Sequence, residues 1–198
     1  MLLVFLLASL LGGCGDGPRL QPLASDAVIL AFGDSLTRGT GAAPGAGYPE
    51  VLAQRTGLQV INDGVPGEVS SSGVQRLAAS LATHAPALVV LVHGGNDMLR
   101  RQPASATGAN LARMIELIRA RGAQVVMLGV PGPSLTLAAP GFYGDVAEAA
   151  AVPIDLSTLP DLMRDRSMKS DQVHFNAAGY ARMAGAVEAL LRESGALP

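Results

Sequence analysis

The chain of 198 residues has no tryptophan, one cysteine, and few aromatic or charged side chains. Aromatic residues make up only 4% of the chain, so we expect a core built chiefly from Ala, Val and Leu. The single cysteine, Cys14, excludes an intrachain disulfide and a multi-cysteine metal site. The net charge is −2 with no block of like charges, which gives no electrostatic reason to expect a nucleic-acid partner.

The motifs of several other enzyme classes are also missing. We find no Gly-x-Ser-x-Gly elbow, no phosphate-binding loop and no His-Glu-x-x-His zinc motif. The glycines at residues 39–44 fail the dinucleotide-binding fingerprint at its last position. We therefore expect neither a metal ion nor a cofactor. With 49% hydrophobic residues, a chain of this length is typical of one globular domain.

The longest apolar run lies at the N-terminus, at residues 2–11. It is too short to span a bilayer but suits the apolar region of a signal peptide, although no Lys or Arg precedes it. The following residues, 11–14, read Leu-Gly-Gly-Cys and resemble a bacterial lipobox, in which Cys14 would carry a lipid. An ordinary cleaved signal peptide with an incidental cysteine is the alternative. We assign residues 1–13 to a lipoprotein-type signal peptide, the Gly- and Pro-containing residues 14–26 to a tether, and residues 27–198 to one domain.

Strand and helix signals alternate along this domain. Short apolar runs predict strands at residues 28–32, 59–62, 87–92, 124–128 and 152–156. Apolar residues at helical spacing, with Pro and Gly at the ends, predict helices at residues 49–56, 72–83, 107–121, 143–151 and 177–193. This alternation indicates an α/β fold with a parallel sheet covered on both faces.

Four short blocks lie where such a sheet would gather ligands. They are Gly-Asp-Ser-Leu at residues 33–36, Gly67, Gly-Gly-Asn-Asp at 94–97, and Asp-Gln-Val-His at 171–174. The first three follow predicted strands, and the last precedes the final helix. Ligands of open parallel sheets bind outside the carboxyl ends of the strands, so we expect the blocks to converge at one edge.

Their residue types suit nucleophilic catalysis. A serine hydroxyl such as that of Ser35 needs a base to remove its proton. Asp171 precedes His174 by three residues, close enough to reach the ring Nδ1 and fix its tautomer. Taken alone, each has a plainer interpretation: Ser35 as a turn or cap serine, and Asp171 as a capping residue beside a surface histidine.

The four blocks together resemble those of the SGNH (GDSL-type) hydrolases, and most of all the bacterial periplasmic thioesterase/lysophospholipase and arylesterase branch. The resemblance extends over residues 28–191. It implies a three-layer α/β/α, flavodoxin-like domain with five parallel strands. It also implies hydrolysis of acyl esters or thioesters through an acyl-Ser35 intermediate. The triad would be Ser35, Asp171 and His174, and the oxyanion hole would use Ser35, Gly67 and Asn96.

The residues beside these blocks could support the site or contact the substrate. We expect Asp97 to bond loop backbone and His93, which has no assigned role, to be a buried structural histidine. The pair at residues 100–101, both Arg, either lies near an anionic head group of the substrate or is simply solvated. The Pro- and Gly-rich loop at residues 130–144 could line an acyl groove.

Other functions stay open on the sequence alone. A carbohydrate O-acetyl esterase would use the same residues. A non-catalytic lipid- or glycan-binding module of this fold is disfavoured by the intact set of site residues, and a flavodoxin-like nucleotide-binding protein by the missing phosphate-binding glycines. We expect a monomer acting on a small acyl ester or thioester in the bacterial cell envelope, facing the periplasm. Its only membrane contact would be the lipid at Cys14.

The lipid assignment has a direct test. Replacing Cys14 with Ser removes the thiol that would carry the lipid, so the protein should move from the membrane fraction to the soluble fraction on cell fractionation. An unchanged distribution would leave the ordinary signal peptide as the better interpretation.

Overall fold

The computed structural model describes residues 17–134 and 136–198. The predicted signal peptide, residues 1–13, and the predicted lipid site, Cys14, lie outside the described residues. The tether is described from residue 17 onward.

Five strands form one parallel sheet in the order β2-β1-β3-β4-β5. The strands are β1 (Val28–Gly33), β2 (Gln59–Gly64), β3 (Leu88–Val92), β4 (Gln124–Leu128) and β5 (Ile154–Asp155). All five predicted strands are confirmed, but β5 covers only two residues of the predicted five. Because β1 pairs with β2 on one side and β3 on the other, the carboxyl ends of these three strands lie together.

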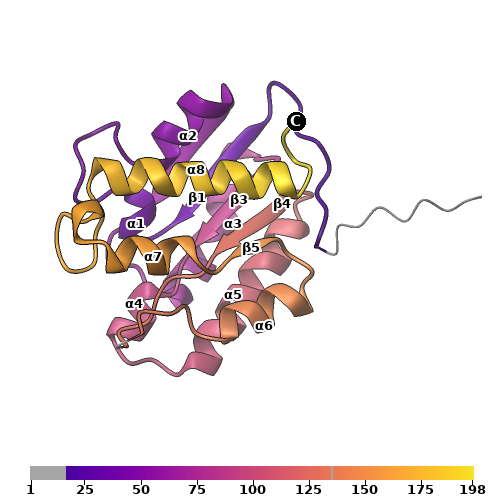
Figure 1. The fold of residues 1–198 in the computed structure, drawn as a ribbon. Coiled ribbons are helices and arrows are strands. Elements are labelled where there is room, and N and C mark those ends of the chain that lie inside the picture. Colours follow the sequence, from indigo (N-terminus) through magenta and orange to yellow (C-terminus); the bar gives the residue numbers. More distant parts are fainter. Residues whose placement is uncertain (1–16, 135) are drawn as a thin grey trace, which may run out of the picture.

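Helices cover both faces of the sheet (Figure 1). One layer contains α2 (Tyr48–Thr56), α7 (Thr158–Arg164) and α8 (Ala177–Glu193), and the other contains α3 (Ser70–His84), α5 (Ala104–Arg119) and α6 (Phe142–Ala149). This is the predicted three-layer α/β/α arrangement. The sequence did not predict the two short helices α1 (Ser35–Arg38) and α4 (Gly95–Leu99), α7, or the 3-10 turn η1 (Arg166–Met168).

The burial of each strand matches its place in the sheet. Every residue of β3 is fully buried, and β1 and β4 are buried along almost their whole length, as expected for central parallel strands. β2 lies at an edge and is only partly buried. The apolar residues that recur at helical spacing along α5 pack in the core; they are Leu111, Met114, Ile115 and Ile118.

The segment before β1 lies against the domain from residue 17 onward. The N–H of Leu20 donates to the carbonyl of Ser194 at 2.8 Å, and that of Leu23 donates to Ala196 at 2.9 Å. Gln21 exchanges two hydrogen bonds with the side chain of Gln124 at the start of β4. Within the described residues, this stretch is therefore part of the folded unit rather than a free tether. In the same residues no helix is both long and apolar enough to cross a bilayer.

The carboxyl end of β1 tolerates only glycine. A Cβ at Gly33 would overlap the carbonyl oxygen of Val92 and the hydroxyl of Thr37. We expect Gly33→Ala to lower the free energy of unfolding by roughly 1–3 kcal/mol, the usual cost of overpacking, as measured by urea denaturation.

The matched control is Gly108→Ala in the middle of α5. A Cβ there meets no atom nearer than 3.7 Å, and Ala favours a helix over Gly. Its stability should be unchanged or higher. Equal effects of the two substitutions would contradict the steric interpretation of Gly33.

Candidate active site

Ser35 is placed by the end of β1 and the start of α1. Asp34 caps this short helix, because its Oδ1 accepts the N–H of Leu36 at 3.0 Å. The helix ends at Gly39, whose φ of 85° is the left-handed conformation that glycine adopts readily. Ser35 is thus the first helical residue, directly beyond the sheet edge.

The segment before α8 delivers Asp171 and His174 to the same edge. Asn176 caps α8 by accepting the N–H of Gly179, and its Nδ2 donates to the carbonyl of Ser167 at 2.8 Å. The carbonyl of His174 accepts the N–H of Ser170 at 3.0 Å. Backbone bonds at both ends therefore hold the loop that carries the imidazole.

The structure brings the three predicted triad residues into hydrogen-bond contact. The Nε2 atom of His174 lies 3.0 Å from the Oγ of Ser35, and its Nδ1 lies 2.8 Å from the Oδ2 of Asp171. A hydroxyl, a base and an acid that orients the base are thus arranged in sequence, as nucleophilic catalysis requires.

Asp171 is held as an anion although half of its side chain is exposed. The hydrogen bond with His174 is the largest cause, and together with the backbone N–H groups of Val173 and His174 it lowers the pKa of Asp171 to about 2. The carboxylate thus remains charged at any pH where the imidazole needs an anionic partner.

Gly67 lies in a tight turn that follows β2. The N–H of Glu68 donates to the carbonyl of Val65 at 3.2 Å, and Gly67 has a φ of 78°. A turn with Pro66 second and glycine third at positive φ fits type II geometry. Gly67 borders the same cavity as Ser35, as the predicted oxyanion role requires.

Asn96 also borders this cavity, but its amide nitrogen is already engaged. Its Nδ2 donates to the Oδ2 of Asp34 and to the carbonyl of Glu68, both at 3.1 Å. An amide nitrogen carries two hydrogens, so both have acceptors. Asn96 could therefore donate to an oxyanion only by sharing or exchanging one of these bonds.

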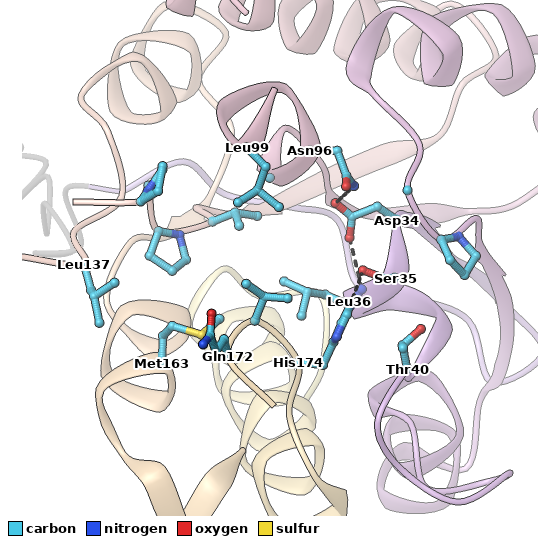
Figure 2. A pocket seen from close by; sticks show the side chains of 18 residues that line it. Asp34, Ser35, Leu36, Thr40, Asn96, Leu99, Leu137, Met163, Gln172 and His174 are labelled. Atoms are coloured by element: carbon cyan, nitrogen blue, oxygen red, sulfur yellow. Dashed lines mark hydrogen bonds between the residues drawn. The ribbon is translucent and has the colours of Figure 1, made fainter. Parts of the chain in front are cut away.

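A cavity of about 310 Å³ opens beside Ser35 and His174 (Figure 2). Figure 2 shows it extending from Ser35 toward Leu137, with Leu99 and Met163 along its walls. Its apolar lining comes from Leu36, Pro66, Leu99, Val130, Pro131, Pro133, Leu137, Met163 and Val173. Residues 130–133 and Leu137, from the segment between β4 and α6, thus form one wall, as predicted for this loop, and no Lys or Arg is among the lining residues.

The neighbouring residues have the structural roles that the sequence suggests. His93 is buried, and Asp97 accepts the backbone N–H of Ser70 at 2.8 Å. Asp34 is buried as well, and burial raises the pKa of its carboxyl above the usual range, although His93 and the N–H of Leu36 act in the opposite direction. Of the two neighbouring arginines, Arg100 donates to the carbonyl of Gly67 at 2.9 Å.

Sequence reasoning missed the polar network behind these loops. Glu68 accepts hydrogen bonds from Arg76 at 2.8 Å and lies 3.1 Å from the Nε2 of His93. Burial alone would raise the pKa of Glu68, but the bonds from Arg76 and His93 outweigh it and hold this pKa at about 2. Only the position of Glu68 beside Gly67 could have drawn attention to it. Within residues 17–134 and 136–198, no group of three or more His, Cys, Asp or Glu side chains is arranged to hold a metal ion.

Comparison with known proteins places this geometry in a family. The sequence profile of the GDSL-like Lipase/Acylhydrolase family matches residues 31–182. Esterase TesA of Pseudomonas aeruginosa is 33% identical over 189 residues, which cover 89% of this chain and 93% of that protein. Thioesterase 1/protease 1/lysophospholipase L1 of Escherichia coli K12 is 28% identical over 160 residues, 75% of each chain. A crystal structure of TesA superposes with a TM-score of 0.76 and 30% identity, covering 83% of this chain and 98% of that one.

The chain belongs to the GDSL-like lipase/acylhydrolase family of SGNH hydrolases. It is accordingly a serine hydrolase, an enzyme that acts on ester bonds. This excludes the non-catalytic binding module and the nucleotide-binding protein that the sequence alone left open.

The depressed pKa of Glu68 makes stability depend on acid pH. An unfolded glutamate titrates near pH 4.3, so the stabilisation from ionised Glu68 is complete above about pH 5 and is lost as the pH falls toward 2. We expect the urea midpoint of the wild type to fall between about pH 5 and pH 3, and that of Glu68→Gln to fall less steeply.

Glu116→Gln is the control, since Glu116 forms an exposed ion pair with Arg113 on α5. It should keep the slope of the wild type, because exposed pairs contribute little. Parallel curves for the wild type and Glu68→Gln would contradict the assignment.

Proposed function

We propose that this enzyme hydrolyses small-molecule acyl esters or thioesters through an acyl-Ser35 intermediate. The observation that carries the proposal is the imidazole of His174, which lies within hydrogen-bond distance of both Ser35 and Asp171 at the mouth of an apolar cavity.

The hydrogen-bond geometry supports one order of proton transfers. With Nδ1–H donating to Asp171, the Nε2 of His174 is free to accept the proton of Ser35 as Oγ attacks the acyl carbonyl. His174 then gives this proton to the departing alcohol or thiol, leaving an ester between the acyl group and Ser35. In the second half, His174 takes a proton from water, the hydroxide attacks the acyl-enzyme, and the proton returns to Oγ as the acid leaves.

The negative charge on the carbonyl oxygen needs donors at the same place. Ser35, Gly67 and Asn96 all line the cavity, and we assign this role to the backbone N–H groups of the first two and, by sharing or exchange of one of its bonds, to the amide of Asn96. Loss of one such donor typically costs roughly 100- to 1,000-fold in kcat.

The lining of the cavity supports an acyl chain rather than a sugar as the group it accepts. Half of its lining residues are Leu, Val, Pro or Met, and they form its walls away from Ser35 and His174, whereas a carbohydrate would need several polar partners there. Each buried methylene contributes about 0.8 kcal/mol, or roughly fourfold in binding. Chains that extend into the cavity should therefore be preferred over acetyl.

We also propose a monomer in the cell envelope, facing the periplasm and anchored through Cys14. The apolar run and the Leu-Gly-Gly-Cys sequence support the anchor. The first described residues lie beside Gln124, at the start of β4. This is the edge of the sheet opposite Ser35, so a lipid attached upstream would leave the mouth of the cavity unobstructed.

The serine mechanism is tested with p-nitrophenyl esters from C2 to C16 and the corresponding thioesters. We expect Ser35→Ala and His174→Ala each to lower kcat by at least roughly 1,000-fold. We also expect kcat/KM of the wild type to rise from C2 through at least C6, by up to about fourfold per methylene.

Ser72→Ala and His84→Ala provide matched controls, because both residues lie on α3 outside the lining of the cavity. They should retain full activity. A Ser35→Ala variant as active as the wild type would refute the acyl-enzyme route, and a preference for acetyl esters with activity on acetylated sugars would favour the carbohydrate esterase.

A further inference from the structure

The turn that presents Gly67 is held by few bonds of its own. The N–H of Val65 donates to the carbonyl of Gly33 at 3.0 Å, and one turn bond joins Glu68 to Val65. The carbonyl of Gly67 accepts from Arg100 at 2.9 Å, but this bond is exposed to solvent. Val65 is exposed, and Gly67 has no side chain to anchor it. A donor that must meet a developing charge needs firmer support, because misplacement by about 1 Å can cost roughly 100-fold in rate.

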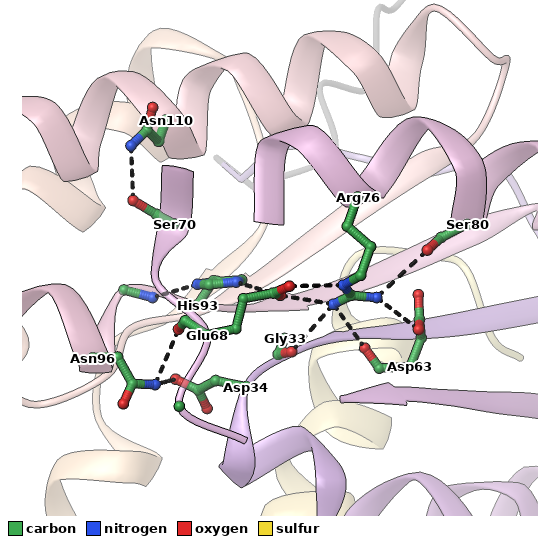
Figure 3. A network of polar contacts seen from close by, with 12 residues as sticks. Gly33, Asp34, Asp63, Glu68, Ser70, Arg76, Ser80, His93, Asn96 and Asn110 are labelled. Carbon is green, nitrogen blue, oxygen red and sulfur yellow. Dashed lines mark hydrogen bonds and ion pairs between the residues drawn. The ribbon is translucent and has the colours of Figure 1, made fainter. Parts of the chain in front are cut away.

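Glu68, the last residue of this turn, supplies such support through its side chain (Figure 3). Only 6% of its side chain is exposed. Both of its carboxylate oxygens accept from Arg76, through Nε and Nη2, each at 2.8 Å. This two-point contact fixes the orientation of the carboxylate as well as its position.

Arg76 is itself fixed to the ends of two strands. Its Nη1 pairs with the carboxylate of Asp63 at 2.6 Å, and its Nη2 reaches the carbonyl of Asp63 at 3.2 Å and that of Gly33 at 3.5 Å. The guanidinium also lies over the ring of Phe32, 4.1 Å from its centroid. It therefore ties the Gly67 turn to the same strand end that positions Ser35.

His93 connects the network to the Asn96 loop. Its Nδ1 accepts the N–H of Gly94 at 3.0 Å, so the proton of a neutral ring resides on Nε2 and points at Glu68. The backbone carbonyl of Glu68 in turn accepts from the amide of Asn96. Glu68 thus contacts both loops that carry the proposed oxyanion donors.

We propose that Glu68 and Arg76, together with His93, are positioning residues that hold the Gly67 N–H and the Asn96 amide in place for the oxyanion. The network touches no reacting atom and acts through these two loops. This inference rests on the proposed acyl-Ser35 mechanism and adds residues that shape its transition state.

The test compares Arg76→Met, Arg76→Lys and Glu68→Gln with the wild type on the best p-nitrophenyl ester. Arg76→Met should lower kcat by roughly 10- to 100-fold and change KM by less than about threefold, because the ground state makes little use of the oxyanion donors. Arg76→Lys, which keeps the charge but not the two-point contact, should lie between Arg76→Met and the wild type. Glu68→Gln should also lose activity, since an amide oxygen and an NH₂ group cannot accept from all three donors.

A second measurement separates positioning from general loss of structure. An alkylboronic acid of the same chain length forms a tetrahedral adduct with a catalytic serine and places an oxygen in the oxyanion hole. Its affinity should fall in Arg76→Met by about the same factor as kcat/KM. All variants are assayed at a temperature where circular dichroism shows them folded. Arg76→Lys and Glu68→Gln carry the test if Arg76→Met does not fold.

Two controls account for stability and for the loss of an ion pair. Leu191→Ala removes a buried side chain near the end of α8, outside the lining of the cavity, and Arg113→Met removes an exposed ion pair on α5. Both should keep the kcat and boronate affinity of the wild type. A kcat for the Arg76 and Glu68 variants within about threefold of the wild type, with Ser35→Ala inactive, would overturn the inference alone, whereas an active Ser35→Ala would overturn the mechanism on which it rests.

Discussion

The position of β1 between β2 and β3 in the parallel sheet is the constraint on which the site depends. β1 pairs with β2 on one side and β3 on the other, so its last residue, Gly33, lies between the ends of both neighbours. The absence of a side chain there lets the carbonyl of Val92 approach, and the chain turns at once into α1. Ser35 therefore emerges between the loop that follows β2 and the loop that follows β3, which carry Gly67 and Asn96.

Burial gives the carboxyl groups at this edge different electrostatic roles. Asp171 is half exposed, and its bonds to His174 and to two backbone N–H groups favour the charged form. Asp34 is buried, and its raised pKa shows that burial outweighs the groups that favour the anion. The side chain of Glu68 is also largely buried, yet Arg76 and His93 keep its pKa low. Asp171 thus stays ionised and orients the imidazole of His174. The carboxyl groups of Asp34 and Glu68 instead form hydrogen bonds that hold the surrounding loops.

The sequence predicted the elements whose signals are local and repeated. The five strands were found because each is a short apolar run. The long helices were found because apolar residues recur at helical spacing and because Pro49, Gly57 and Gly195 mark helix ends in the chain itself. The helices α1, α4 and α7 contain at most seven residues, too few for a periodic pattern. Their ends are set by the sheet edge and by tertiary contacts, which no window of sequence contains.

The site shows the same division between local and long-range information. Asp171 and His174 are three residues apart, so their contact follows from local geometry, and the family resemblance supplied Ser35. The ion pair of Glu68 and Arg76 spans eight residues across the start of α3, and the contact of Glu68 with His93 spans 25. Neither spacing has a sequence signature. The sequence also could not show that the amide of Asn96 is already hydrogen-bonded, because its two acceptors come from residues 28 and 62 positions away.

The engaged amide of Asn96 bears on how the site distinguishes the transition state from the ground state. One of its bonds goes to a neutral acceptor, the carbonyl of Glu68, and such a bond contributes only about 1 kcal/mol net. The carbonyl oxygen of a bound ester is no better an acceptor and has no reason to displace it. An oxyanion accepts roughly twice as strongly, so it can draw the N–H away or share it. The amide would then contribute little to substrate binding and most at the tetrahedral stage, which is the differential stabilisation that raises kcat rather than lowering KM.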